Sequence, residues 1–168
     1  MPIASVVLMS LISGAPLDAS VSTTRGGEVR LKTLWGKPCV LFYEDREGAS
    51  LNQGLKKALF TKGKQERKLD AVKVVAVANL KAFAWYPART FAEAAIASAE
   101  QKAGIPLYAD WTGALLVAPW NLPASGSTVV VLDARGGEVW RGTGDLSEAD
   151  QAKVLSAIES LLASAALP

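Results

Sequence analysis

The chain has 168 residues, half of them hydrophobic and a fifth of them charged, a globular composition with room for one domain. Its 18 basic and 16 acidic residues give a net charge of +2, too small to indicate nucleic acid, and no nucleic-acid partner is expected. There is no histidine and only one cysteine, Cys39. A zinc site, a Cys-His nucleophile pair and an intramolecular disulfide are therefore excluded, and no metal or cofactor is expected.

Residues 1–13 form an apolar N-terminal extension. It is too short for a transmembrane span. It has the apolar core of a secretion signal, but no Lys or Arg precedes it. We expect an ordered strand or helix that packs on the domain or on a partner, with a secretion signal as the alternative. The same reasoning favours the cytoplasm, with the periplasm as the alternative. Three residues of this run are candidate interface residues: Val7, Leu8 and Leu11.

Strand-like and helix-like segments alternate along the chain. The run 39–43 is continuously apolar, which is typical of a strand buried on both faces. Ser50 and Ser147 are expected to cap the helices that follow them. In chain order the sequence predicts a strand at 28–31, a strand at 39–43, a helix from 50 to 64, a strand at 72–77, a helix at 87–102, a short strand at 106–110, an irregular crossing at 112–122, a strand at 127–132, its hairpin partner at 138–141 and a last helix after 147.

This order of elements indicates the fold class. Strand–helix–strand repeats require parallel neighbours, and the late hairpin adds antiparallel strands at one side. We therefore predict an α/β fold over residues 1–168, treated as one domain. Its mixed central sheet has a parallel core and a C-terminal antiparallel hairpin, and it is flanked by helices.

Four segments carry a resemblance to a known family: Gly14-Ala15-Pro16 with 29–31, the run LWGKPCVLF at 34–42, the run STVVVLD at 127–133 with 137–139, and Gly144-Asp145-Leu146-Ser147 before the last helix. The arrangement resembles the thioredoxin-like fold, a three-layer sandwich, in the form shared by peroxiredoxins and TlpA-type extracytoplasmic thioredoxins. Within that fold, 110–122 and 127–133 look most similar to YtfJ-type proteins, a mainly periplasmic group.

The redox motif of that fold is missing. Redox members carry a Cys-x-x-Cys or a peroxidatic cysteine just after the strand that here ends at 43–44, and Glu47 and Ser50 stand at those positions. Members also usually carry a cis-proline before the late strand, where this chain has Ser127. A cis bond ahead of a non-proline residue costs about 2.5–4 kcal/mol, so we expect a trans bond. Six residues at this place are candidate binding residues: Glu47, Gly48, Ala49, Ser50, Ser127 and Thr128.

An acidic cluster, 44–47, precedes the helix after Gly48. Paired carboxylates can bind a metal or act as acid and base, but acidic residues at a helix N-terminus also simply suit the helix dipole. The second interpretation is favoured, because a hard cation wants about six oxygen ligands. Ser50 has no histidine to activate it as a nucleophile.

Four large aromatic residues lie in connections between the strong strands: Trp85, Tyr86, Trp111 and Trp120. Aromatic residues in loops either cover the end of a sheet core or form a protein interface. Both interpretations stay open, and the candidate interface residues among them are Trp85, Tyr86 and Trp111.

The leading hypothesis is a redox-inactive thioredoxin-like domain that acts as a protein-interaction or scaffold module, through an unidentified protein partner or as a homodimer. The alternative is a binder of a small ligand or anion, or a non-thiol enzyme, that uses residues 44–50. A one-cysteine peroxidase is disfavoured, because a thiolate needs an electropositive, partly exposed place and Cys39 lies in a strand.

Overall fold

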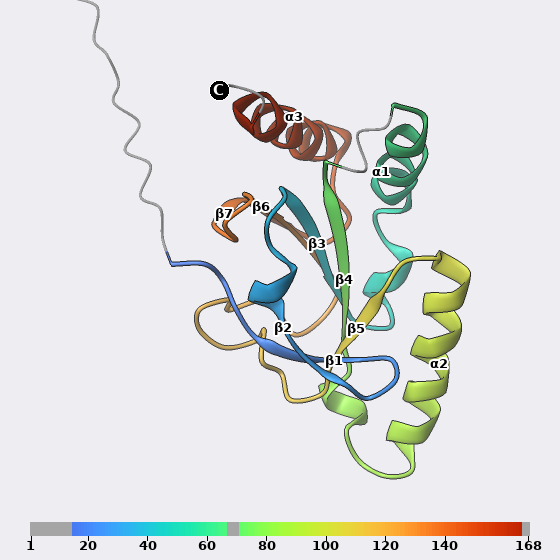
Figure 1. The fold of residues 1–168 in the computed structure, drawn as a ribbon. Coiled ribbons are helices and arrows are strands. Elements are labelled where there is room, and N and C mark those ends of the chain that lie inside the picture. The colour runs from blue at the N-terminus through green and yellow to red at the C-terminus, as the bar shows by residue number, and fades with distance from the viewer. Residues whose placement is uncertain (1–14, 67–70, 166–168) are drawn as a thin grey trace, which may run out of the picture.

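A seven-stranded mixed sheet is the centre of the molecule (Figure 1). The structure is a computed structural model that describes residues 15–66 and 71–165. The apolar extension with Val7, Leu8 and Leu11 therefore lies outside the described residues. Across the sheet the strand order is β2-β1-β5-β4-β3-β6-β7. The strands are β1 (Ser20–Thr23), β2 (Glu28–Arg30), β3 (Cys39–Glu44), β4 (Lys73–Asn79), β5 (Leu107–Asp110), β6 (Ser127–Leu132) and β7 (Glu138–Thr143).

Three parallel strands form the middle of the sheet, as predicted. β3 is parallel to β4, and β4 is parallel to β5. On the other side of β3, β6 runs antiparallel and forms the expected hairpin with β7. Cys39 to Tyr43 are all buried, because β3 has a strand on either side and a core on both faces. The predicted α/β class and mixed sheet are confirmed.

Three α-helices cover one face: α1 (Gln53–Glu66), α2 (Ala88–Ala103) and α3 (Glu148–Ala165). Val40 and Phe42 pack in one core cluster with residues of α1 and α3, and Val74 packs against that cluster. Ala78, four residues further along the same strand, packs in a cluster with Ile96 of α2. Since residues an even number apart on a strand share a face, the three helices lie on the same side.

The opposite face is covered by irregular chain. Cys39, Leu41 and Tyr43 pack there against Leu115 and Trp120, which belong to the predicted crossing at 112–122. A short 3-10 helix, η1 (Leu31–Leu34), supplies the buried Leu31 to the same core. The sheet therefore lies between a layer of long helices and a layer of loops.

The carboxyl ends of the parallel strands meet at one edge of the sheet. β3 ends at Glu44, β4 at Asn79 and β5 at Asp110. A 3-10 helix follows each of the first two ends: η2 (Gly48–Ser50) leads to α1, and η4 (Lys81–Phe83) leads to α2. Within the described residues, no helix is long and apolar enough to cross a membrane.

The helix boundaries are close to the predicted ones. α2 ends at Ala103 and is capped by Gly104, whose φ of 68° lies in the left-handed region that glycine adopts most readily. Ser147 caps α3 as predicted, because its Oγ accepts a hydrogen bond of 3.1 Å from the N–H of Asp150. Ser50, by contrast, does not cap α1, and this prediction was wrong. Ser50 belongs to η2, and its Oγ donates a hydrogen bond of 2.9 Å to the carbonyl of Glu47.

Candidate functional site

The segment predicted from the sequence to match the redox loop, 44–50, lies at the carboxyl end of β3. A turn follows Glu44, and Asp45 fixes it: its Oδ1 accepts from the N–H of Gly48 at 2.7 Å. The N–H of Asp45 donates to the carbonyl of Gly126 at 3.1 Å. The turn is thereby bound to the loop that enters β6, so the two segments that the sequence predicted to form the site lie side by side.

Glu44 is the centre of a polar network at this place. Lys56 of α1 lies with its Nζ 2.8 Å from Glu44 Oε1, and both side chains are less than one-fifth exposed. The Oγ of Ser127, at the start of β6, donates to the same carboxylate oxygen at 2.7 Å. Lys56 Nζ also donates to the carbonyl of Ala49 at 3.1 Å. The carboxylate is therefore neutralised by an internal lysine.

Asn52 continues the network from the residue before α1. Its Nδ2 donates to Ser127 Oγ and to the carbonyl of Gly144, each at 3.0 Å, and its Oδ1 accepts from the N–H of Leu146 at 2.9 Å. Asn52 adopts a φ of 55°, a region that asparagine tolerates better than most residues. The side chain thus connects three segments that are far apart in the sequence. In the described residues, no buried side-chain nitrogen or oxygen lacks a hydrogen-bond partner.

The backbones of η2 and of the β6 entry are in direct contact. A Cβ on Gly48 would lie only 1.9 Å from the carbonyl oxygen of Gly126 and 2.7 Å from the nitrogen of Ser127. Only a residue without a side chain fits at position 48. The two segments leave no space between them for a bound chain or ligand at this point.

The predicted binding residues divide into a buried and an exposed group. Gly48, Ser127 and Thr128 are buried, while Glu47, Ala49 and Ser50 are exposed. The peptide bond before Ser127 is not among the cis bonds of the described residues, which precede Pro87 and Pro119. No group of three or more His, Cys, Asp or Glu side chains in the described part of the chain is arranged to hold a metal.

The sequence analysis did not find Asn52 and Lys56. An asparagine directly before a helix and a lysine one turn inside it are common on protein surfaces, so neither residue type gave a signal. Their role depends on which strand end and which loop they meet, and this is fixed by the fold.

Cys39 lies at the opposite end of β3 from this site. Its exposed fraction is 1%. Burial raises the pKa of the thiol to about 12, and the nearby charge of Lys73 lowers it only in part. The thiol is therefore protonated at neutral pH, and it is not positioned to react with a molecule in solution.

The four aromatic residues of the connections divide in two. Trp111 and Trp120 are buried, with exposed fractions of 8% and 0%, so Trp111 offers little surface to a partner. Trp85 and Tyr86 are exposed by 62% and 85%. Phe91, in the first turn of α2, is exposed by 73% and was not singled out from the sequence. We call Trp85, Tyr86 and Phe91 the aromatic patch.

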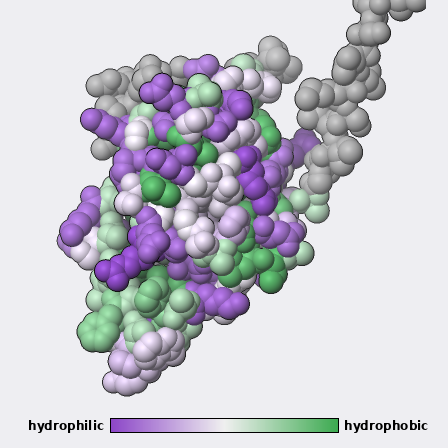
Figure 2. All heavy atoms as spheres, turned by 180° about the vertical axis from the view of Figure 1, so that it is seen from behind, coloured by the Kyte–Doolittle hydropathy of each residue, from purple (hydrophilic) through white to green (hydrophobic). Residues whose placement is uncertain are grey.

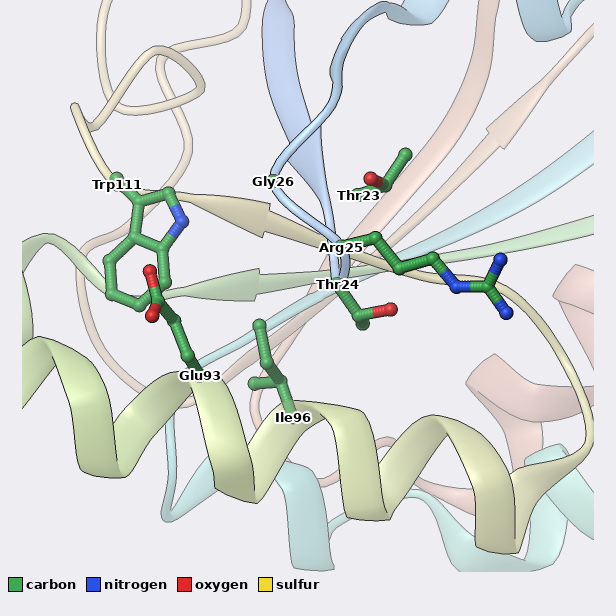
Figure 3. A pocket seen from close by; sticks show the side chains of 7 residues that line it. All are labelled: Thr23, Thr24, Arg25, Gly26, Glu93, Ile96 and Trp111. Carbon is green, nitrogen blue, oxygen red and sulfur yellow. The ribbon is translucent and has the colours of Figure 1, made fainter.

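A shallow pocket of about 170 Å³ lies between the β1–β2 turn and α2. Figure 3 shows Glu93 beside the ring of Trp111, while the side chain of Arg25 points away from both. Arg89 lies over the Trp111 ring at 4.5 Å and bonds to Glu93 at 2.9 Å, so the charges next to the ring are paired. The pocket is lined by Thr23, Thr24, Arg25, Gly26, Glu93, Ile96 and Trp111.

No family model and no curated protein matches the sequence. Solved structures match it over most of its length. A protein assigned as the thiol:disulfide interchange protein DsbE from Chlorobium tepidum superposes with a TM-score of 0.61 at 17% identity, over 91% of this chain and 99% of that one. A DsbF homologue from Corynebacterium diphtheriae gives 0.60 at 16% identity, over 86% of each chain. This chain has a thioredoxin-like fold.

A third match is an uncharacterized thioredoxin-like protein from Porphyromonas gingivalis, with a TM-score of 0.56, 14% identity, and coverage of 87% of this chain and 90% of that one. At these identities the comparisons show the thioredoxin-like fold and no shared activity. In this chain the segment at the carboxyl end of β3 carries Glu44, Asp45 and Glu47 and no cysteine.

Proposed function

We propose that this chain is a redox-inactive thioredoxin-like module that binds another protein or a second copy of itself. One observation carries the proposal: the Glu44–Lys56–Ser127–Asn52 network fills the place where the sequence predicts the redox motif to have been. A network whose buried polar groups are all satisfied favours a fixed structure over a reactive one. The one thiol is buried at the far end of the strand.

The aromatic patch supports the binding role. It follows η4, so it lies beyond the same edge of the sheet as the network (Figure 1). Exposed Trp and Tyr residues are enriched among the residues that contribute most to protein interfaces. Large exposed apolar patches are uncommon on proteins that act alone.

The anion-binding alternative has less support at residues 44–50. The four N–H groups of 48–51 donate internally, to Asp45 Oδ1 and to the carbonyls of Asp45, Glu47 and Gly48. An anion at this turn would find none of those donors free. A similarity to YtfJ-type proteins and a cytoplasmic location, with the periplasm as the alternative, stay predictions from the sequence.

The proposal is tested by two measurements on the full chain. A photo-crosslinking amino acid at position 86, introduced in cells that express the chain, is expected to give a discrete protein adduct. The same group at Ala152, an exposed residue of α3, is the matched control and should give none. Disulfide reductase and peroxidase assays are expected to show no turnover above that of Cys39→Ala. Turnover that Cys39→Ala abolishes, or equal crosslinking at both positions, would overturn the proposal.

A further inference from the structure

The side of α2 that faces away from the sheet is free of charge over most of its length. Ile96 and Ala92 form the inner side, which packs on Leu80, Ala109 and Trp111. About half a turn round the helix lie four exposed residues with the spacing i, i+3, i+4, i+7. We call these residues the outward face: Phe91, Ala94, Ala95 and Ser98.

The outward face and the aromatic patch share Phe91 and are continuous at the start of α2. Figure 2, seen from behind, shows hydrophobic side chains gathered at the lower left, over the end of the molecule where α2 begins. A large aromatic side chain can bury about 150–250 Å². Multiplied by the exposed fractions of Trp85, Tyr86 and Phe91, this gives roughly 450 Å² of exposed surface for the aromatic patch. A stable interface takes roughly 800 Å² from each partner, so these rings supply about half of one.

Part of this surface is already held in place. The indole Nε1 of Trp85 donates to the carbonyl of Ala82 at 3.0 Å, which fixes the exposed ring. The N–H of Arg89 donates to the carbonyl of Trp85 at 2.9 Å and anchors the turn to the helix. A ring that is ordered before binding loses less conformational entropy when a partner covers it.

We propose that this surface binds a second copy of the chain, with the two α2 helices antiparallel across a two-fold axis; the inference rests on the proposed function and names its partner. A two-fold contact needs one surface that is complementary to itself. The outward face carries a large residue, Phe91, and three small ones on the same side. With the axis between Ala94 and Ala95, each Phe91 meets Ser98 of the other copy, where small side chains let the helices approach closely.

The charges favour the antiparallel direction. Lys102, in the last turn of α2, is the nearest charged residue on this side of the helix. In an antiparallel pair it lies beside the Tyr86 end of the other copy, where an ammonium group is attracted to an aromatic ring. In a parallel pair the two Lys102 side chains would meet and repel each other. Opposed helix dipoles favour the antiparallel pair as well.

The test is the mass of the full chain in solution. Light scattering from about 1 to about 200 μM covers the range in which a weak dimer forms. The wild-type chain of 17.7 kDa is expected to approach twice that mass. Ala95→Arg, which places two guanidinium groups at the axis, is expected to weaken the dimer at least about tenfold. Ala152→Arg makes the same substitution on the exposed side of α3 and should dimerise as the wild type does.

A second variant reports the geometry directly. On a Cys39→Ala background, Ala95→Cys is expected to form a disulfide-linked dimer on mild oxidation, and Ala152→Cys is not. A wild-type chain that stays monomeric to about 200 μM, or a dimer that Ala95→Arg leaves intact, would overturn the inference. Neither result contradicts the proposed function, because a monomer can fulfil it through another protein. The proposed function is overturned instead by turnover that depends on the thiol or by equal crosslinking at positions 86 and 152.

Discussion

Gly48 and Gly126 approach so closely that a single added carbon atom on Gly48 would overlap the Gly126 carbonyl oxygen, at 1.9 Å. This contact joins the turn after β3 to the entry of β6, and the Glu44–Lys56–Ser127–Asn52 network lies directly behind it. The space between the carboxyl end of β3 and the start of β6 is thus closed by packing.

Gly48→Ala is expected to destabilise the protein by about 3 kcal/mol or more, because backbone atoms on both sides must move to make room for the methyl group. Gly54→Ala is the matched control. Gly54 lies in α1, where a Cβ would come no closer than 3.6 Å to its nearest neighbour. Alanine is the better helix former by about 1 kcal/mol, so this variant should be as stable as the wild type or more so. Urea unfolding of both variants checks the prediction, and a stable Gly48→Ala protein would contradict it.

Lys56→Met is expected to cost about 2 kcal/mol, because it leaves the carboxylate of Glu44 mostly buried without its counter-charge. Glu44→Gln also destabilises, since the lysine is then the unpaired charge. The double variant removes both charges, so its loss should be smaller than the sum of the two single losses by about 1 kcal/mol or more. Denaturant unfolding of the four proteins gives this coupling energy. Additive losses would show that the ion pair contributes little.

The sheet and its central strand could be predicted from the sequence for a physical reason. A strand covered on both faces must be apolar at every position, and the run Cys39 to Tyr43 shows this without knowledge of any other element. β1 was missed, because a four-residue strand with three polar residues has little pattern of its own. Its place is set by pairing with β2 and β5.

The site could be located from the sequence, but its contents could not be predicted. The resemblance placed Glu47–Ser50 beside Ser127, and the structure brings these segments together. The bonds that fill the site join residues as far apart as Asn52 and Leu146. Such hydrogen bonds depend on how the turns lie relative to each other in the folded chain, and this arrangement cannot be predicted from a short stretch of sequence. In the same way, Trp85 and Trp120 both stand in loops, and only the fold decides which one is buried.

The Cys39 thiol is expected to react with a soluble disulfide reagent at least about 1000-fold more slowly in the native protein than in denaturant at pH 8. Two causes act together: the side chain is buried, and its pKa is raised to about 12, so almost no thiolate is present. The absorbance change on labelling, with and without denaturant, gives the two rates. Complete labelling of the native protein within minutes would contradict the buried position.

Trp120→Ala is expected to destabilise the protein by about 3–5 kcal/mol, the usual cost of removing a large core side chain. It removes a fully buried indole and the hydrogen bond of 3.0 Å from its Nε1 to the carbonyl of Asp18. Trp85→Ala makes the same change at a mostly exposed position and should cost less than about 1 kcal/mol. Thermal unfolding distinguishes the two. A large loss for Trp85→Ala would mean that its ring stabilises the domain and is not available to a partner.

Glu100 is expected to stabilise the fold at neutral pH and to lose this effect in acid. It accepts a hydrogen bond of 2.8 Å from the N–H of Leu107 and another of 2.8 Å from Thr24 Oγ1, and these bonds lower the pKa of the carboxyl below its ordinary value of 4.5. A carboxyl whose pKa is lower in the folded state contributes its stability above the unfolded pKa, and the contribution is lost as the pH falls through the folded pKa.

Glu100→Gln should therefore cost about 1 kcal/mol at pH 7 and less at pH 3, relative to the wild type at each pH, because the loss shrinks as the pH falls toward the folded pKa. Denaturant unfolding at both pH values gives the two differences. Glu159→Gln changes an exposed carboxylate of α3 and serves as the control for general charge effects. Equal destabilisation by Glu100→Gln at both pH values would contradict this prediction, because the effect would then come from packing. The two hydrogen bonds to the carboxylate, from Leu107 of β5 and from Thr24 of the β1–β2 turn, would in that case not stabilise the contact with α2.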